Sequence, residues 1–182
     1  MMSELHVLTG APGAGKTAIL DAVGPAVRRV REPARAVLAE QRSAGDVGTP
    51  DRDPSLFVDL LLRRSIADHR AAERAGVLAL FDRGVPDCVA YARMLDVDAR
   101  ASLEAAEAFR YHPEVLVAAP WEAIYAVDDE RTMSFAGTAR FHAAIVDAYE
   151  RAGYALLPVP RDSVGRRAAF VRDAMGVGDG GS

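Results

Sequence analysis

The chain has 182 residues, of which half are hydrophobic, 22 are basic and 26 are acidic, so the formal net charge is −4. This length predicts one domain over residues 1–175, followed by a flexible glycine-rich tail at 176–182. The acidic balance argues against a nucleic-acid-binding protein, the single cysteine excludes an internal disulfide or a cysteine-based zinc site, and no apolar run approaches the length of a membrane span. Because the first residues lack the pattern of a signal peptide, we expect a cytoplasmic protein.

Apolar segments that are typical of buried strands alternate with helical patterns along the chain. In chain order, we expect strands near residues 5–9, 27–31, 77–81, 114–118 and 155–159. Helices are expected over residues 16–23, 33–43, 54–75, 86–95, 98–110, 138–152 and 163–174. This alternation predicts an α/β domain that is built around a parallel sheet.

The turn after the first expected strand carries the strongest motif. Its sequence is Gly10-Ala11-Pro12-Gly13-Ala14-Gly15-Lys16-Thr17, which matches the Walker A pattern G-x-x-x-x-G-K-[ST], and Ala18 continues the helix that follows. Glycines let such a loop bring its N–H groups close to phosphate oxygens, and the positive end of the helix adds to the attraction. We therefore expect residues 10–18 to bind the phosphates of ATP, with Lys16 at the β- and γ-phosphates and the Thr17 hydroxyl on Mg²⁺. The alternative is a glycine-rich turn without a ligand.

Lys16 is also the only lysine in the chain, since the other 21 of the 22 basic residues are arginine. A lone lysine could stand at this position by chance. Because an arginine fork cannot replace a slim ammonium group, the motif around Lys16 favours a functional reason. The same count excludes the N-K-x-D motif with which Ras-type GTPases recognise guanine.

The third expected strand ends in Phe81-Asp82-Arg83-Gly84. ABC and AAA+ hydrolases usually carry a glutamate after the strand-end aspartate to activate water, and here that position is Arg83. An Asp-Arg pair at this point is typical of nucleoside and nucleotide kinases, in which the aspartate holds Mg²⁺ through water and the arginine binds the acceptor or its phosphates. Asp82 is therefore our predicted metal residue alongside Thr17, and Arg83 is the predicted acceptor contact. The alternative is a surface turn that is closed by a local ion pair.

Two further charged residues are candidates for the catalytic site. Glu32 follows the second expected strand, where a carboxylate can take the proton from an attacking hydroxyl, and a solvated glutamate at a helix start is an equal alternative. Arg131 follows the fourth strand, where nucleotide kinases place a lid whose arginine closes on the phosphates. Arg140 is the second candidate for that role, and a solvated mixed-charge loop is the alternative. Trp121, beside the same segment, either stacks on a substrate base or is buried under the lid.

With these residues in place, the chain resembles a family of short bacterial predicted ATPases with an AAA domain, P-loop proteins that are grouped with the nicotinamide riboside kinase domain. The resemblance covers most of the chain and rests on the segments Gly10–Thr17, Phe81–Asp87, Ile124-Tyr125 with Asp128–Arg131, His142–Ile145, and Pro158–Ser163 with Arg167. It implies a three-layer P-loop fold with five parallel strands in the kinase-like order 2-3-1-4-5, a lid segment, and binding of ATP and Mg²⁺.

We therefore predict an ATP- and Mg²⁺-dependent phosphotransferase that acts on a small hydroxyl- or phosphate-bearing metabolite such as a nucleoside. In this scheme, Lys16 and Arg131 stabilise the transferring phosphoryl group, and Glu32 accepts the proton. A slow ATPase or nucleotide-sensing switch that acts through a protein partner is the alternative, and a scaffold without nucleotide binding is the third. We expect a nucleotide triphosphate and a small-molecule acceptor as ligands, with no role for nucleic acid or membrane. The acceptor's identity and the oligomeric state are open.

Overall fold

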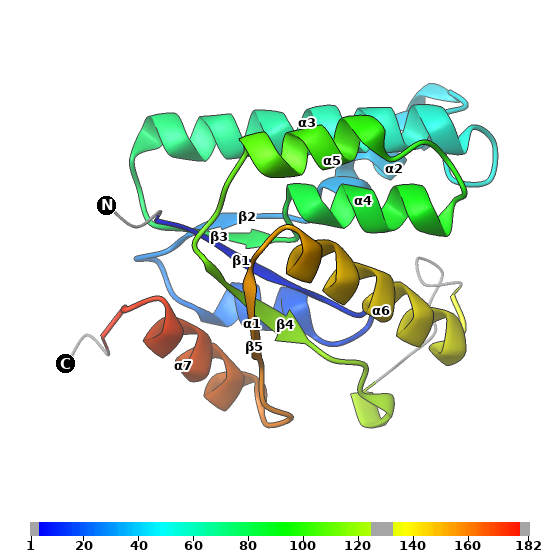
Figure 1. Ribbon diagram of the computed structural model, residues 1–182. Coiled ribbons are helices and arrows are strands. Elements are labelled where there is room, and N and C mark those ends of the chain that lie inside the picture. The colour runs from blue at the N-terminus through cyan, green and yellow to red at the C-terminus, as the bar shows by residue number, and fades with distance from the viewer. Residues whose placement is uncertain (1–3, 125–132, 179–182) are drawn as a thin grey trace.

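Five parallel strands form one sheet in the computed structural model, which describes residues 4–124 and 133–178 (Figure 1). The strands are β1 (Leu5–Gly10), β2 (Arg28–Val30), β3 (Ala79–Asp82), β4 (Glu114–Ala118) and β5 (Ala155–Pro158). Their order in space is β2-β3-β1-β4-β5. This order confirms the predicted fold class and places β1, which leads into the Walker A motif, at the centre of the sheet.

Helices connect the strands and cover the sheet. Those of the described ranges are α1 (Lys16–Ala22), α2 (Pro33–Ala44), α3 (Pro54–Ala75), α4 (Val85–Met94), α5 (Arg100–Ala108), α6 (Phe135–Arg151) and α7 (Val164–Ala174). A short 3₁₀ helix, η1 (Glu122–Ile124), follows β4. Within the described ranges, no helix is both long enough and apolar enough to cross a membrane.

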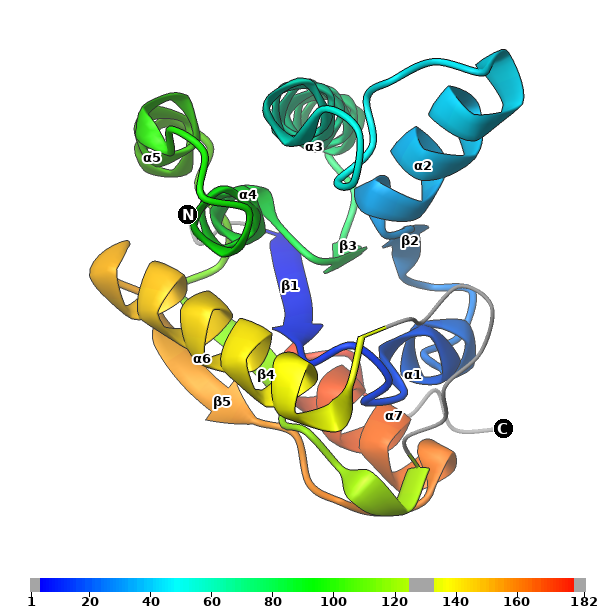
Figure 2. The ribbon, with the colours of Figure 1, turned by 90° about the vertical axis from the view of Figure 1, so that its right-hand side faces the viewer.

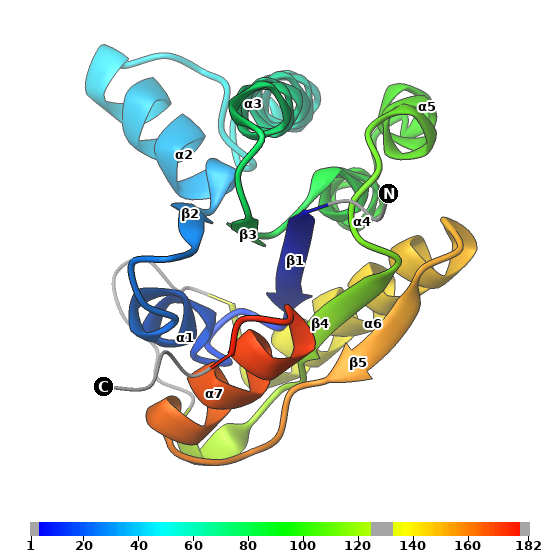
Figure 3. The ribbon, with the colours of Figure 1, turned by 90° about the vertical axis from the view of Figure 1, so that its left-hand side faces the viewer.

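The three central strands β3, β1 and β4 are buried on both faces, as expected of parallel strands that are joined by helical crossovers. Figures 2 and 3 show α1 and α7 next to each other on one face, where the two helices pack against Leu8, Leu80 and Leu116 of the sheet. The other face meets α3, α4 and α6, and neighbouring strand residues such as Val7 and Phe81 point toward them. This alternation follows from the two-residue repeat of a strand, which sends successive side chains to opposite faces.

The register of the strands brings three of the predicted site segments to the same edge of the sheet. Leu8 of β1 lies opposite Asp82 of β3, Val30 of β2 lies opposite Phe81, and Gly10 lies opposite Ala118 of β4. Because the strands are parallel, the loops that follow β1, β2 and β3 leave the sheet on the same side. The Walker A residues, Glu32 and Arg83 are therefore close in space although they are far apart in the sequence.

Most predicted boundaries agree with the structure to within one residue. The helix expected over residues 98–110 is α5, which is two residues shorter at each end, and two further boundaries also need correction. The helix expected to begin at residue 138 begins at Phe135, because the Ser134 hydroxyl accepts a hydrogen bond from the Gly137 N–H and caps the extra turn. The third strand ends at Asp82 and starts two residues later than expected, so Asp82 is part of the strand. The predicted lid around Arg131 and the tail residues 179–182 lie outside the described residues.

Candidate active site

The Walker A turn is held against the end of β4. Gly10 has a φ of 124°, and a Cβ at this position would lie 2.1 Å from the carbonyl oxygen of Ala118. The N–H of Ala11 donates to that same oxygen at 3.0 Å. Gly13 and Gly15 also have positive φ values, of 73° and 78°, which only glycine adopts readily. The three glycines therefore permit the tight turn that the motif predicts.

Lys16 is buried beneath this turn. Its Nζ donates to the carbonyl oxygens of Ala11 at 2.9 Å and Gly10 at 3.4 Å, and the residue is 6 % exposed. Burial lowers the pKa of Lys16 to about 8, and the nearby charge of Arg83 acts in the same direction. The ammonium is thus still largely protonated at neutral pH, and neutral carbonyl oxygens are its hydrogen-bond acceptors.

Arg83 links the acceptor side of the predicted site to the Walker A turn. Its Nε donates to Glu32 Oε1 at 2.8 Å, while its Nη1 donates to Asp87 Oδ1 at 2.9 Å and to the Gly10 carbonyl oxygen at 3.1 Å. The side chain is only 4 % exposed, so this residue does not lie in a surface turn. The structure therefore brings Glu32, Arg83 and the phosphate loop together as the sequence predicts.

Glu32 and Asp82 have opposite electrostatic environments. Burial would raise the pKa of Glu32, but the charges of Arg83 and Lys16 outweigh it and lower the pKa to about 2. Glu32 is therefore ionised at neutral pH and is a weak proton acceptor. Asp82 is 2 % exposed, and this burial raises its pKa. The nearby positive charge of Lys16 offsets only part of that effect.

Asp82 and Thr17 fit the predicted magnesium site. Asp82 Oδ1 is buried and has no hydrogen-bond partner within the part of the chain that the structure describes, although Asp82 lies close enough to Lys16 to be influenced by its charge. Thr17 is half-buried at the start of α1. Mg²⁺ prefers oxygen ligands and usually takes one or two from the protein while phosphates and water supply the rest. An unpartnered carboxylate oxygen beside the phosphate loop satisfies that requirement.

Asp87 is a buried member of this site whose role the sequence analysis missed. Its carboxylate accepts hydrogen bonds from Thr9 Oγ1 at 2.6 Å, Tyr149 Oη at 2.7 Å, Arg83 Nη1 and the Gly84 N–H. These donors come from β1, from α6 and from the segment that joins β3 to α4. Its place in the first turn of α4, three residues after Gly84, was the available signal, because an acidic residue there caps the helix.

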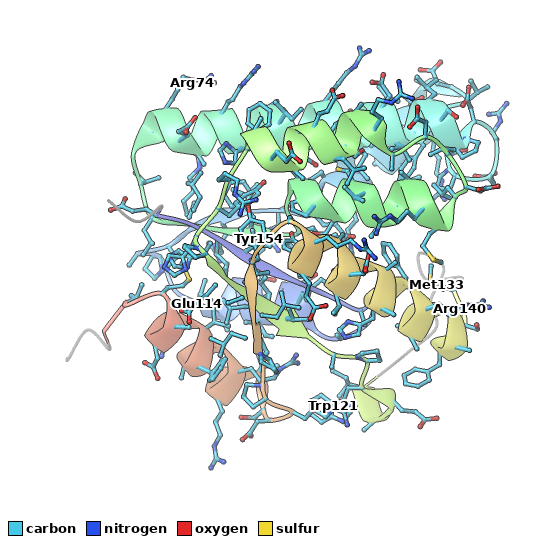
Figure 4. The ribbon with its side chains drawn as sticks, viewed as in Figure 1. Arg74, Glu114, Trp121, Met133, Arg140 and Tyr154 are labelled. Atoms are coloured by element: carbon cyan, nitrogen blue, oxygen red, sulfur yellow. The ribbon has the colours of Figure 1, made fainter. Side chains whose placement is uncertain are left out.

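The remaining candidates occupy different surroundings. Arg140 is exposed on α6, where Figure 4 labels it, and Arg131 lies outside the described residues. Trp121 is half-buried beside η1 (Figure 4), and its ring lies 5.7 Å from the Arg167 guanidinium. Arg167 of α7 donates from Nη2 to the Ala14 carbonyl oxygen at 2.7 Å, so a residue near the end of the fold also contacts the phosphate loop.

The fold is similar to those of the NadR protein and of two kinases. A crystal structure of the NadR protein in complex with NR matches with a TM-score of 0.62 and 16 % identity, covering 95 % of this chain and 50 % of the NadR chain. Thymidylate kinase from Ehrlichia chaffeensis matches with a TM-score of 0.61 and 13 % identity, covering 97 % of this chain and 100 % of its own. Deoxyadenosine kinase from M. mycoides, whose structure holds the products dCMP and dCDP, matches with a TM-score of 0.63 and 12 % identity over 94 % of this chain and 98 % of its own.

The chain spans half the length of the NadR chain, so the likeness to that protein concerns one part of it. The comparison with curated proteins gives no match. At these identities, the structural likeness shows the fold alone. A sequence model of a family described as an AAA domain matches residues 5–167, which include the Walker A motif, the Asp82-Arg83 pair and Arg167. The chain accordingly belongs to this AAA-domain family.

Proposed function

We propose that the protein transfers the γ-phosphoryl group of ATP to a hydroxyl of a small metabolite, with a nucleoside as the first class to test. The observation that carries the proposal is the buried contact of Arg83 with both Glu32 and the Gly10 carbonyl oxygen. It supports an acceptor site directly beside the phosphate loop. Two of the similar structures, NadR in complex with NR and a deoxyadenosine kinase, favour the same class of acceptor.

Each residue of the site has a separate role in phosphoryl transfer. The acceptor's hydroxyl oxygen attacks the γ-phosphorus, the bond to the β–γ bridging oxygen breaks, and ADP leaves. Lys16 and the loop N–H groups neutralise charge on the phosphates, as does Arg131 in this proposal. Arg83 orients the acceptor. Mg²⁺, when held by Thr17 and Asp82, supplies further charge neutralisation.

Glu32 orients the attacking hydroxyl and receives its proton. Its pKa of about 2 makes it a weak base, so the proton moves late, when the new bond to phosphorus has already acidified the hydroxyl. Such late transfer suits phosphoryl transfer, because its loose transition state needs placement and charge neutralisation more than a strong base. This role requires Glu32 to be ionised, which its environment ensures at neutral pH.

A phosphate-transfer screen tests the proposal. Purified protein is incubated with γ-labelled ATP, Mg²⁺ and single acceptors, namely nicotinamide riboside, deoxyadenosine, thymidine and unrelated small alcohols. We expect a labelled product with at least one nucleoside-type acceptor, and we expect that Glu32→Gln lowers the rate of its formation. Release of labelled inorganic phosphate at the same rate with and without every acceptor would instead identify an ATPase.

A further inference from the structure

A buried arginine from the last helix of the domain lies directly against the phosphate loop. Arg167 of α7 is 3 % exposed, and its Nη2 donates to the Ala14 carbonyl oxygen at 2.7 Å. A Cβ on Gly15 would lie 2.8 Å from Nη1 of the same guanidinium. Gly15 therefore leaves the space that the guanidinium occupies, and the arginine covers the loop immediately before Lys16.

The charge of Arg167 has no counter-charge in the part of the chain that the structure describes. Burial lowers its pKa, and no carboxylate among those residues acts against this effect. Its Nε is buried and has no hydrogen-bond partner among residues 4–124 and 133–178. Arg83, which is equally buried, differs in this respect because Glu32 and Asp87 both pair with it. A neutral N–H donor could satisfy the hydrogen-bonding capacity of the Ala14 carbonyl oxygen equally well. This hydrogen bond therefore does not explain why a charged side chain is buried here.

Burial of an unpaired cation is unfavourable, and proteins normally pair such a group with an anion. Lys16, on the same loop, is likewise buried with carbonyl oxygens as its partners. Two buried cations lie at one glycine-rich turn, and their hydrogen bonds within the described ranges go to carbonyl oxygens. This arrangement indicates an anionic ligand with several charges. The phosphate chain of a nucleotide has this character, and an arginine binds phosphate oxygens through several donors at once.

We propose that Arg167 contacts the phosphate chain of the bound nucleotide and, together with Lys16, neutralises it. This assignment rests on the proposed function, since it requires that a nucleotide binds at the Walker A turn. The Trp121 ring, 5.7 Å from the guanidinium, helps to keep its plane in place before the ligand arrives. Nucleotide binding thereby joins α7 and η1 to the phosphate loop.

The test compares Arg167→Gln with Arg167→Lys, which keeps the charge, and with the control Arg166→Gln. Arg166 is the neighbouring residue, and its side chain is 79 % exposed. For each variant, we would measure the unfolding temperature without ligand. Calorimetric titration then gives the affinities for Mg·ATP and for inorganic tripolyphosphate. We expect R167Q to unfold at the wild-type temperature or above it, because a buried unpaired charge is removed. We also expect it to bind both ligands about tenfold or more weakly, with most of the affinity recovered in R167K and no change in R166Q.

Each other result has a distinct meaning. An R167Q variant that is less stable without ligand but binds ATP like the wild type would show a purely structural residue and overturn the proposal. A loss of affinity for ATP without any loss for tripolyphosphate would place Arg167 at the base or ribose, which also contradicts it. Failure of the wild-type protein to bind ATP would refute the proposed function itself, and Lys16→Ala would then change nothing either.

Discussion

Lys16 illustrates how one side chain can meet requirements that an arginine cannot. Its ammonium fits beneath a turn in which both neighbouring acceptors, at Gly10 and Ala11, are main-chain oxygens. An arginine has a wider, planar head group, so it would not fit the same space. The 21 arginines elsewhere in the chain show that this protein uses the other cation freely. The residue type at position 16 thus follows from the shape of the turn.

Replacement of Lys16 tests this explanation. We expect both Lys16→Ala and Lys16→Arg to weaken ATP binding roughly 10- to 100-fold, since each loses a charge-assisted hydrogen bond that only the ammonium can form. Calorimetric titration with Mg·ATP measures the effect. Arg63→Ala is the control, because that side chain is 75 % exposed on α3, where it pairs with Asp59. Wild-type affinity in K16R would contradict the argument about shape.

The lowered pKa of Lys16 predicts a pH dependence. In the ligand-free protein, the pKa is about 8, below the usual 10.5. As the pH rises through this window, the folded protein loses the proton before the unfolded chain does, so stability without ligand increases. Bound phosphates favour the charged form, so ATP binding takes up a proton at pH 8 and above. Titrations in buffers of different ionisation enthalpy measure this uptake, and it should be absent in K16A.

At the scale of elements, Asp87 joins parts of the fold that carry the site. Its carboxylate binds Thr9 on β1 and Tyr149 on α6, while the residue itself begins α4. The hydrogen bonds hold Arg83 in a positive-φ conformation, with φ at 75°, that a non-glycine residue rarely adopts. The network therefore stabilises both the packing of α4 against α6 and the orientation of the guanidinium.

A double-mutant cycle tests whether this network acts as a unit. We expect Thr9→Val and Tyr149→Phe each to lower the free energy of unfolding by about 1–2 kcal/mol, because each removes a buried hydrogen bond to a carboxylate. The free energy of unfolding of the double variant should differ measurably from the sum of the two single effects, since the hydroxyls donate to the two oxygens of one carboxylate. Urea unfolding monitored by circular dichroism provides the values. Strict additivity would show that Thr9 and Tyr149 contribute independently.

The close approach of Gly10 to β4 makes a second prediction at this scale. Gly10→Ala places a methyl group against the Ala118 carbonyl oxygen in a strained backbone conformation. We expect it to destabilise the fold by roughly 1–3 kcal/mol and to weaken ATP binding at least tenfold. Gly165→Ala is the matched control, because the space around Gly165 on α7 is open. The stability of the Gly165→Ala variant should be unchanged or slightly higher. Thermal unfolding with and without Mg·ATP measures the stability and the ATP binding of both variants.

At the scale of the whole molecule, the features that can be predicted from the sequence are those that depend on local patterns. The Walker A turn and the helix over 54–75 are set by short-range signals: in the latter, the Asp53 carboxylate caps the first turn by accepting from the Leu56 N–H at 2.9 Å. The strand order was expected from the resemblance to P-loop proteins, and the structure confirms it. The experiments above test the predicted roles of Lys16 and Glu32, and the roles of Asp82, Arg83 and the lid residue Arg131 stay predictions.

Contacts between distant residues could not be predicted in the same way. Thr9 and Asp87 are separated by 78 positions, and no periodic pattern relates a threonine in a strand to an aspartate in a later helix turn. The hydrogen bond from Arg167 to Ala14 joins residues 153 positions apart. Such pairs depend on the register of the sheet and on how the helices pack, and both are properties of the complete fold.

The distance of Arg167 along the chain has a consequence for synthesis. The ribosome makes residues 10–17 early, but the arginine that bonds to the Ala14 carbonyl oxygen emerges only after β5, close to the completion of the domain. A nascent polypeptide that lacks α7 therefore exposes a phosphate loop without that partner. Tight nucleotide binding would then require synthesis to have passed Arg167, so fragments that end before α7 should bind ATP weakly.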